Sequence, residues 1–236
     1  MLRPLAFLFD LNGTMINDMP YHISAWHRIM NELGANISLE RMKEECYGKN
    51  HEVIERIFPG RFTDAEKTKM SIRKERQYQK DFRPHLKLID GLEKFLADSG
   101  RAGIKLGVGS AAIMINIDFV LDGLSIRKYF EAIVSADDVT KSKPNPETWL
   151  KCADKLNLPP HNCLVFEDSP KGAESALNAG MRSLIITTLH KKDEFGNYKN
   201  VIGFIDDYNC IVLDHFNQPV IMQRNGDSYR LPDVSK

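Results

Sequence analysis

Short apolar runs that alternate with helical patterns constrain the fold of this chain more than any other feature of its sequence. Each run ends in polar or small residues, as buried parallel strands do. The runs cover residues 5–9, 104–109, 132–134, 163–166 and 183–186. Helical patterns cover residues 91–99, 111–121, 146–156 and 170–179, the last closed by Gly180. This alternation predicts an α/β fold with a doubly wound parallel sheet.

The alternation breaks between residues 15 and 88, where no convincing strand occurs. Trp26, Ile29 and Met30 recur at helical spacing, which indicates one of several amphipathic helices. We therefore expect a helical domain of residues 15–88, inserted into an α/β core domain of residues 1–14 and 89–236. Its entry at residues 15–18 and its exit at residues 84–90 are polar or contain proline, so we interpret them as hinges of a lid.

The composition narrows the class of protein. The 236 residues carry 32 Lys and Arg against 32 Asp and Glu, so net charge gives no case for a nucleic-acid binder. The longest apolar runs fall far short of the roughly 20 residues that span a bilayer, and the first run is too short for a signal peptide. We expect a cytoplasmic protein, a monomer or weak dimer, that binds neither nucleic acid nor membranes. The cysteines form no C-x-x-C pair and are expected to be free, buried thiols: Cys46, Cys152, Cys163 and Cys210.

Polar side chains follow the predicted strands, and in an open α/β sheet ligands bind at that edge. Asp10, Ser110 and the pair Glu167 and Asp168 come directly after apolar runs, and Lys143 lies in a polar segment after another. These groups suit phosphoryl transfer, because a transferring phosphoryl group spreads negative charge over its oxygens. Mg²⁺ bound by carboxylates would let another carboxylate approach phosphorus, and lysine would offset the remaining charge.

Four segments in this order resemble the motifs of the haloacid dehalogenase superfamily. They are Phe9-Asp10-Leu11-Asn12-Gly13-Thr14, Ser110, Lys143-Pro144 and Glu167-Asp168-Ser169. The extended stretches Lys143-Pro144-Asn145-Pro146-Glu147 and Glu167-Asp168-Ser169-Pro170-Lys171-Gly172 are most similar to the β-phosphoglucomutase-like branch. The resemblance reaches to about Asp206, and it implies that residues 15–88 form a cap that determines substrate specificity.

The resemblance also implies a role for each motif residue. Asp10 would attack phosphorus and form an aspartyl-phosphate. Mg²⁺ would be held by Asp10, the backbone carbonyl of Asn12 and Asp168, with Glu167 beside or among the ligands. Ser110 and Lys143 would hold the phosphoryl oxygens. The other expected phosphate-binding positions are Leu11, Gly13, Ala111 and Thr14, the last supporting the loop.

Asn12 departs from the pattern, because phosphatases and mutases of the superfamily have aspartate two residues after the nucleophile. That aspartate gives a proton to the leaving oxygen and later takes one from the attacking water, whereas an amide cannot. General acid–base catalysis contributes about 10²- to 10⁴-fold. Four interpretations stay open: an engineered change, a natural variant for good leaving groups, a proton supplied by a cap histidine, or a phosphate-binding protein without activity.

Candidate substrate-binding residues lie in the predicted cap. His22 shares a helical spacing with Asp18 and Trp26, so this face could meet the substrate, or Trp26 could be a core residue and His22 a surface or satisfied histidine. Lys49 and His51 occupy a turn from which they could reach a distal phosphate or a sugar hydroxyl, or they could be solvated. Residues 73–76 are interpreted as an exposed charged face of a helix.

Together these patterns predict a Mg²⁺-dependent phosphatase or phosphotransferase for a small phosphorylated metabolite. A phosphosugar mutase and a non-catalytic phosphate-binding protein are the alternatives. The segment after Asp206 is expected to form a hairpin or an addition to the sheet edge and carries no predicted chemistry. Its apolar residues are Phe216, Val220, Ile221 and Met222, followed by Asn225-Gly226.

Overall fold

The computed structural model describes residues 5–196, 198–214, 219–222 and 228–230. The chain divides into two compact units. The α/β unit comprises Met1–Asn17 and Lys87–Lys236, and the helical unit comprises Asp18–Leu86.

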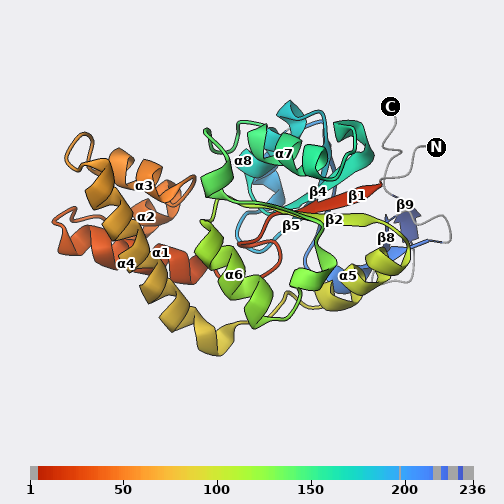
Figure 1. Cartoon of the computed structure of the whole chain (residues 1–236), viewed down its shortest axis with the longest axis horizontal. Coiled ribbons are helices and arrows are strands. Elements are labelled where there is room, and N and C mark those ends of the chain that lie inside the picture. The colour runs from red at the N-terminus through yellow and green to blue at the C-terminus, as the bar shows by residue number, and fades with distance from the viewer. Residues whose placement is uncertain (1–4, 197, 215–218, 223–227, 231–236) are drawn as a thin grey trace. The chain divides into compact units, whose positions relative to one another are not determined.

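A six-stranded parallel sheet forms the centre of the α/β unit, in the order β3-β2-β1-β4-β5-β6 (Figure 1). Its strands are β1 (Ala6–Phe9), β2 (Lys105–Gly109), β3 (Ala132–Val134), β4 (Cys163–Glu167), β5 (Arg182–Ile186) and β6 (Val201–Ile205). In the middle of the sheet, Phe9 of β1 lies opposite Val108 of β2 and Phe166 of β4. The predicted doubly wound α/β fold is therefore confirmed.

Helices cover both faces of this sheet. Figure 1 shows α7 and α8 on one side of the strands and α5 and α6 on the other. These helices are α5 (Leu92–Arg101), α6 (Met114–Gly123), α7 (Glu147–Lys155) and α8 (Pro170–Asn178). Single-turn 3-10 helices occur at Arg127–Tyr129, Ala136–Asp138, Pro160–Asn162, Lys192–Phe195 and Tyr208–Cys210.

The alternating residues of β1 supply the two cores of the α/β unit. Ala6 and Leu8 belong to an apolar cluster with Trp149 of α7 and Ala176 of α8. The next residues along the strand face the other way, because successive side chains of a strand alternate. On that side an aromatic cluster gathers around the sheet, formed by Phe7, Phe9, Phe95, Phe166 and Tyr208.

The C-terminal part of the α/β unit contains one parallel strand that the sequence did not predict, β6, which extends the sheet at its edge. Beyond it, β7 (Ile211–Leu213), β8 (Pro219–Met222) and β9 (Ser228–Arg230) form a separate antiparallel sheet in that order. The expected pairing after Asp206 is present between β8 and β9. Phe216 and Asn225-Gly226 lie outside the described residues.

The helical unit consists of α1 (Met19–Glu32), α2 (Leu39–Glu45), α3 (Asn50–Ile57) and α4 (Asp64–Phe82), followed by a 3-10 turn at Arg83–His85. The hydroxyls of Ser38 and Thr63 cap the N-termini of α2 and α4 by accepting backbone N–H bonds. The core of the unit gathers around Trp26, which is 1% exposed, together with Met30 and Ile54. Trp26 is therefore a core residue of this unit.

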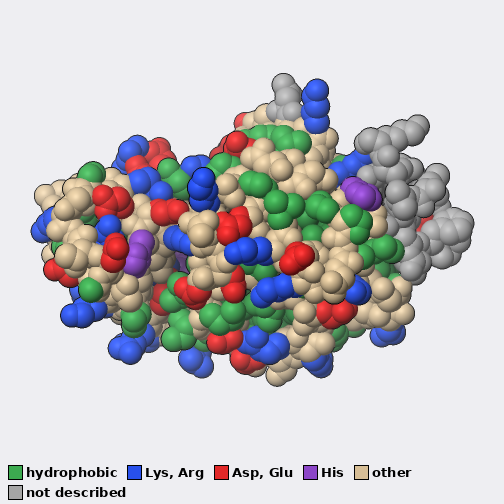
Figure 2. Space-filling view, turned by 45° about the horizontal axis from the view of Figure 1, so that its top comes forward, with side chains coloured by type: hydrophobic (Ala, Val, Ile, Leu, Met, Phe, Trp, Pro, Cys, Tyr) green, Lys and Arg blue, Asp and Glu red, His purple; other side chains and the backbone are tan. Residues whose placement is uncertain are grey.

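The structure bears on three sequence predictions, which concern charge distribution, membrane-spanning segments and the cysteines. Acidic and basic side chains are interspersed over the visible face in Figure 2. Within the described residues, no helix is both long and apolar enough to cross a membrane. All four cysteines are free, as predicted, but only Cys152 and Cys163 are buried, whereas Cys46 and Cys210 are half-buried.

Candidate active site

Three carboxylates meet at the carboxyl ends of two neighbouring strands. Asp10 follows β1, Glu167 ends β4, and Asp168 follows it. β1 and β4 are paired up to Phe9 and Phe166, so the residues just beyond them lie together at one edge of the sheet. One ligand oxygen from each carboxylate lies within 4.8 Å of the others, and the three residues are 7%, 1% and 4% exposed. The sequence-predicted acidic residues thus form one buried cluster.

Lys143 is the cation within this cluster. It lies between β3 and α7, and its Nζ donates to Asp10 Oδ1 at 2.6 Å and to Glu167 Oε1 at 2.7 Å. The ammonium also lies 4.2 Å from the ring centre of Trp149. Burial disfavours the charged ammonium, but the carboxylates of Asp10 and Glu167 outweigh that effect and raise the pKa of Lys143 above its ordinary value. Lys143 is therefore a permanent positive charge beside Asp10.

Backbone groups hold the second oxygen of Glu167. Glu167 Oε2 accepts the N–H groups of Asp168 and Ser169, each at 2.8 Å, and the Ser169 hydroxyl at 3.0 Å. A Cβ atom on Gly172 of α8 would lie only 1.8 Å from the Glu167 carboxyl carbon. The carboxylate therefore has one orientation, fixed by the first turn of α8 on one side and by Lys143 on the other.

The turn after Asp10 fits closely against Asp168. Gly13 has φ of +80°, and a Cβ there would lie 2.1 Å from Asp168 Oδ2. The Gly13 carbonyl accepts the Thr188 hydroxyl at 2.5 Å, and Thr14 Oγ1 donates to Asp168 Oδ1 at 3.4 Å. The Gly13 N–H donates to the Ile16 carbonyl at 2.8 Å, so it is engaged within the turn. Glycine is needed here for both its backbone conformation and its lack of a side chain.

Ser110 and Ala111 follow β2, the other neighbour of β1. Ser110 is buried, and its Oγ accepts the Ala112 N–H at 3.1 Å. Its own N–H donates to the Val134 carbonyl at 2.9 Å. The N-cap of α6 is Ile113, so capping that helix is not the role of Ser110. In the nucleophile turn, Leu11 is buried and Asn12 is half-buried.

The donor set of the cluster fits a divalent cation such as Mg²⁺. Hard carboxylate oxygens are the ligands that Mg²⁺ and Ca²⁺ prefer. Three ionised carboxylates and one ammonium carry a formal charge of 1 − 3 = −2, which a divalent cation would neutralise. The close fit of Gly13 and Gly172 against Asp168 and Glu167 holds these carboxylates in place before any ion binds.

The sequence profile of the haloacid dehalogenase-like hydrolases matches residues 7–186. The chain belongs to this family. Fructose-1-phosphate phosphatase YqaB of Escherichia coli strain K12 is 28% identical over 190 residues, covering 79% of this chain and 98% of that protein. Beta-phosphoglucomutase of Bacillus subtilis strain 168 is 32% identical over 186 residues, covering 75% and 80%.

Solved structures agree with this assignment. A family IA, variant 3 hydrolase of the haloacid dehalogenase superfamily from Entamoeba histolytica has a TM-score of 0.79 and 27% identity, covering 89% of this chain and 96% of that one. Beta-phosphoglucomutase from Clostridium difficile has a TM-score of 0.76 and 27% identity, covering 86% and 91%. Within the haloacid dehalogenase superfamily, the chain is thus a subfamily IA member close to the β-phosphoglucomutase-like phosphatases.

In this superfamily member, His22 of α1 is a buried residue rather than a surface one. Its Nε2 lies 3.2 Å from Asp18 Oδ2, and its ring stacks on Tyr78 at a centroid distance of 3.7 Å. Its Nδ1 lies 2.5 Å from Lys74 Nζ, and Lys74 in turn donates to Glu75 Oε1 at 3.0 Å. His22 therefore belongs to a buried polar cluster inside the helical unit.

The interpretation of residues 73–76 as an exposed face is wrong for its two central residues. Lys74 and Glu75 are 2% and 3% exposed, whereas Arg73 and Arg76 are exposed. A run of charged residues suggests one exposed face, but one turn of α4 places adjacent residues on different sides of the helix. The buried Glu75 also accepts a hydrogen bond from Asn50 Nδ2 at 2.7 Å. From the sequence, Asn50 is placed only in a turn and Tyr78 has no role, since nothing in an amide or a tyrosine alone signals such a cluster.

Lys49 and His51 lie at the start of α3, where the expected turn occurs. Lys49 is the residue before α3, and its N–H donates to Glu52 Oε2 at 2.9 Å. His51 Nε2 lies 3.1 Å from Thr68 Oγ1 of α4. Both residues are half-buried. Their predicted contact with the substrate stays a prediction.

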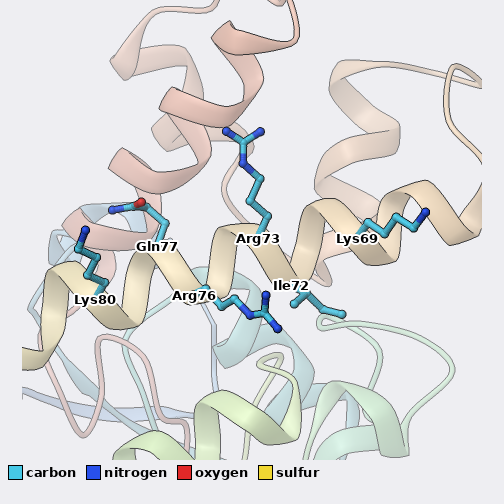
Figure 3. Close-up of a pocket in the computed structure, with 6 residues that line it drawn as sticks. All are labelled: Lys69, Ile72, Arg73, Arg76, Gln77 and Lys80. Carbon is cyan, nitrogen blue, oxygen red and sulfur yellow. The ribbon is translucent and has the colours of Figure 1, made fainter.

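A basic surface hollow of about 450 Å³ lies along α4. It is lined by Lys69, Ile72, Arg73, Arg76, Gln77 and Lys80. Figure 3 shows Arg73 on one side of the helix and Ile72 with Arg76 on the other, and Arg73 pairs with Glu32 of α1. None of these residues was a predicted site residue, and none of them belongs to the carboxylate cluster.

Proposed function

We propose that this chain is a Mg²⁺-dependent phosphatase for a small phosphorylated metabolite, in the class of phosphorylated sugars. The observation that carries the proposal is the buried cluster of Asp10, Glu167 and Asp168 with Lys143 hydrogen-bonded inside it. Relatives named as a fructose-1-phosphate phosphatase and a hexitol phosphatase support the substrate class.

Asp10 acts as the nucleophile in this proposal. Lys143 lies 2.6 Å from Asp10 Oδ1, so its charge sits beside that carboxylate and offsets the negative charge of an approaching phosphoryl group. Ser110 follows the neighbouring strand and supplies a hydroxyl to a phosphoryl oxygen. Attack by Asp10 on phosphorus releases the sugar alcohol and leaves an aspartyl-phosphate, which water then hydrolyses to free phosphate.

Asp10 and Asp168, with the carbonyl of Asn12, would hold the metal. When bound, Mg²⁺ supplies charge neutralisation that lets an anionic phosphate approach a carboxylate. Glu167 serves mainly to orient the others, because Oε2 already accepts three hydrogen bonds from the first turn of α8. Its Oε1 fixes Lys143 in place.

Asn12 limits the rate of this chemistry. An amide cannot protonate the leaving oxygen or take a proton from the attacking water, so proton transfer must use solvent or another group. We infer that the chain hydrolyses phosphoesters more slowly than its Asn12→Asp variant. Esters with good leaving groups are the least affected, because they need no proton from the protein.

The helical unit is the substrate-selecting part in this proposal, and His22, Lys49 and His51 are its candidate contacts. The carboxylate cluster, Lys143 and Ser110 provide groups for the phosphoryl end, and the rest of the substrate needs further contacts. We further propose that the protein works in the cytoplasm, as a monomer or weak dimer, on a freely diffusing metabolite.

The experiment compares this chain with Asn12→Asp on fructose 1-phosphate, hexitol phosphates, β-glucose 1-phosphate and p-nitrophenyl phosphate, with Mg²⁺ and with chelator. We expect Mg²⁺-dependent phosphate release by both proteins, about 10²- to 10⁴-fold faster for Asn12→Asp on the sugar esters. Asp10→Asn is the control and abolishes release in either background. Conversion of β-glucose 1-phosphate to glucose 6-phosphate would instead identify a mutase. If neither protein releases phosphate from any ester, the proposed phosphatase function is wrong.

A further inference from the structure

Tyr208 packs against Phe9 and Phe166, the strand residues next to Asp10 and Glu167, although it comes from a part of the chain beyond the family match to residues 7–186. It begins the single-turn helix after β6 and is 1% exposed. Its ring lies 6.4 Å from that of Phe9, 6.0 Å from that of Phe166 and 5.9 Å from that of Phe95, measured between centroids. Its hydroxyl donates to the backbone carbonyl of Thr14 at 3.0 Å.

The backbone of Tyr208 contacts the other segment that joins the two units. Its N–H donates to the Asp90 carbonyl at 2.9 Å. At Gly91, a Cβ would lie 2.6 Å from the Tyr208 carbonyl carbon and 2.5 Å from the Asn209 nitrogen, so this contact requires glycine. Tyr208 therefore holds the chain both where it leaves the α/β unit, at Thr14, and where it returns, at Asp90.

These two segments are also hydrogen-bonded to each other and to the site. The Ile89 N–H donates to the Met15 carbonyl at 2.9 Å, and the Met15 N–H donates to the Leu11 carbonyl at 2.9 Å. The Thr14 carbonyl accepts the Tyr208 hydroxyl, and the Thr14 hydroxyl donates a hydrogen bond to Asp168. A continuous set of hydrogen bonds thus runs from Tyr208 through the nucleophile turn to a carboxylate of the cluster.

Tyr208 is suited to this task because its hydroxyl stays protonated. Burial and the nearby charges of Asp168 and Asp10 raise the pKa of Tyr208 well above its ordinary value. The phenol is therefore a hydrogen-bond donor at neutral pH. The surrounding phenylalanine rings leave its ring little freedom to move.

We propose that Tyr208 is a positioning residue that fastens the turn of residues 10–15 and the returning segment of residues 89–91 into one geometry. The hydroxyl contributes by holding the Thr14 carbonyl, and the ring contributes by packing under the strand ends. The effect on catalysis rests on the proposed phosphatase function, whereas the effect on the backbone does not.

The first measurement is hydrogen exchange on Tyr208→Phe, which keeps the ring and removes only the hydroxyl. The matched control is Tyr198→Phe, whose hydroxyl donates to Glu174 of α8 at 3.3 Å, at a site without contact to the turn. We expect the amides of Gly13, Met15 and Ile89 to exchange about 3- to 10-fold faster in Tyr208→Phe, the range that one net hydrogen bond corresponds to. The control should leave them unchanged. Unchanged exchange in Tyr208→Phe would overturn the proposal, whatever the activity of the protein.

The second measurement is steady-state kinetics in the Asn12→Asp background, where turnover is easiest to follow. We expect Tyr208→Phe to lower kcat about 3- to 10-fold with little change in KM, because the hydroxyl positions the nucleophile and touches no substrate. Equal loss in Tyr198→Phe, or unchanged kcat despite faster exchange, would refute the positioning role. If the parent background itself releases no phosphate, the proposed function fails, and the exchange data alone decide whether Tyr208 fastens the turn.

Discussion

Replacing Lys143 with methionine removes the ammonium from the carboxylate cluster while keeping most of the apolar stem beside Trp149. The ammonium lies 2.6 Å from Asp10 Oδ1 and 2.7 Å from Glu167 Oε1, and all of these groups are buried. Removing one partner of a buried ion pair costs about 3–5 kcal/mol, since it leaves uncompensated charge. At about 2–4 °C per kcal/mol for a chain of this size, the metal-free variant should melt about 6–20 °C below the parent.

Mg²⁺ should reverse part of this loss, because a cation at the cluster replaces the missing positive charge. We therefore expect Mg²⁺ to raise the Tm of Lys143→Met by more than it raises the Tm of the parent. Thermal melts in chelator and in graded Mg²⁺ measure both effects, with Lys141→Met, an exposed lysine two residues away, as the control. Phosphate release should also fall about 10²- to 10³-fold, as when a catalytic charge stabiliser is removed.

The reasoning is refuted if Lys143→Met and Lys141→Met melt together in chelator. An equal rise in Tm with Mg²⁺ in both variants would show that the metal does not replace the positive charge that Lys143 places beside the three carboxylates.

Two further predictions concern other buried contacts. Gly172→Ala should displace the Glu167 carboxylate, lower the free energy of unfolding by about 1–3 kcal/mol and weaken the Mg²⁺-dependent rise in Tm. Its control is Gly100→Ala in α5, where a Cβ meets nothing within 4 Å and which should raise the free energy of unfolding by about 0.4–1 kcal/mol. Equal effects of the two substitutions in urea unfolding would contradict the close fit at Gly172. Lys74→Met should lower the free energy of unfolding by about 3–5 kcal/mol in the same assay, and Arg73→Met by at most about 1 kcal/mol, because only the Lys74 side chain is buried. Similar losses in the two variants would show that both side chains are solvated.

The parallel sheet could be predicted because its strands are buried on both faces and read as continuous apolar runs. β3 begins and ends where the pattern placed it, at Ala132–Val134. β6 escaped prediction because its sequence, Val-Ile-Gly-Phe-Ile, lies at the edge of the sheet, where only Ile205 is buried. Its apolar residues are half-exposed there, and a central glycine weakens the strand pattern.

The carboxylate cluster could be predicted because the edge of a parallel sheet brings strand ends together, whatever the rest of the fold. Lys143 was found by its motif, but its place between Asp10 and Glu167 depends on a loop path that no periodicity encodes. Tyr208 and Lys74 could not be assigned from sequence for a related reason. Their partners lie 194 and 52 residues away, at Thr14 and His22, and only tertiary structure makes such contacts visible.

The hydrogen bond between Ile89 and Met15 has a consequence for how such a chain can be built and changed. Because the two ends of the 69 residues from Asp18 to Leu86 are anchored side by side on the α/β unit, that whole stretch has the form of an insertion at a single point. No strand of the parallel sheet lies within this stretch. A graft that spans the same two anchor residues would exchange one helical unit for another while leaving every strand of the parallel sheet unchanged.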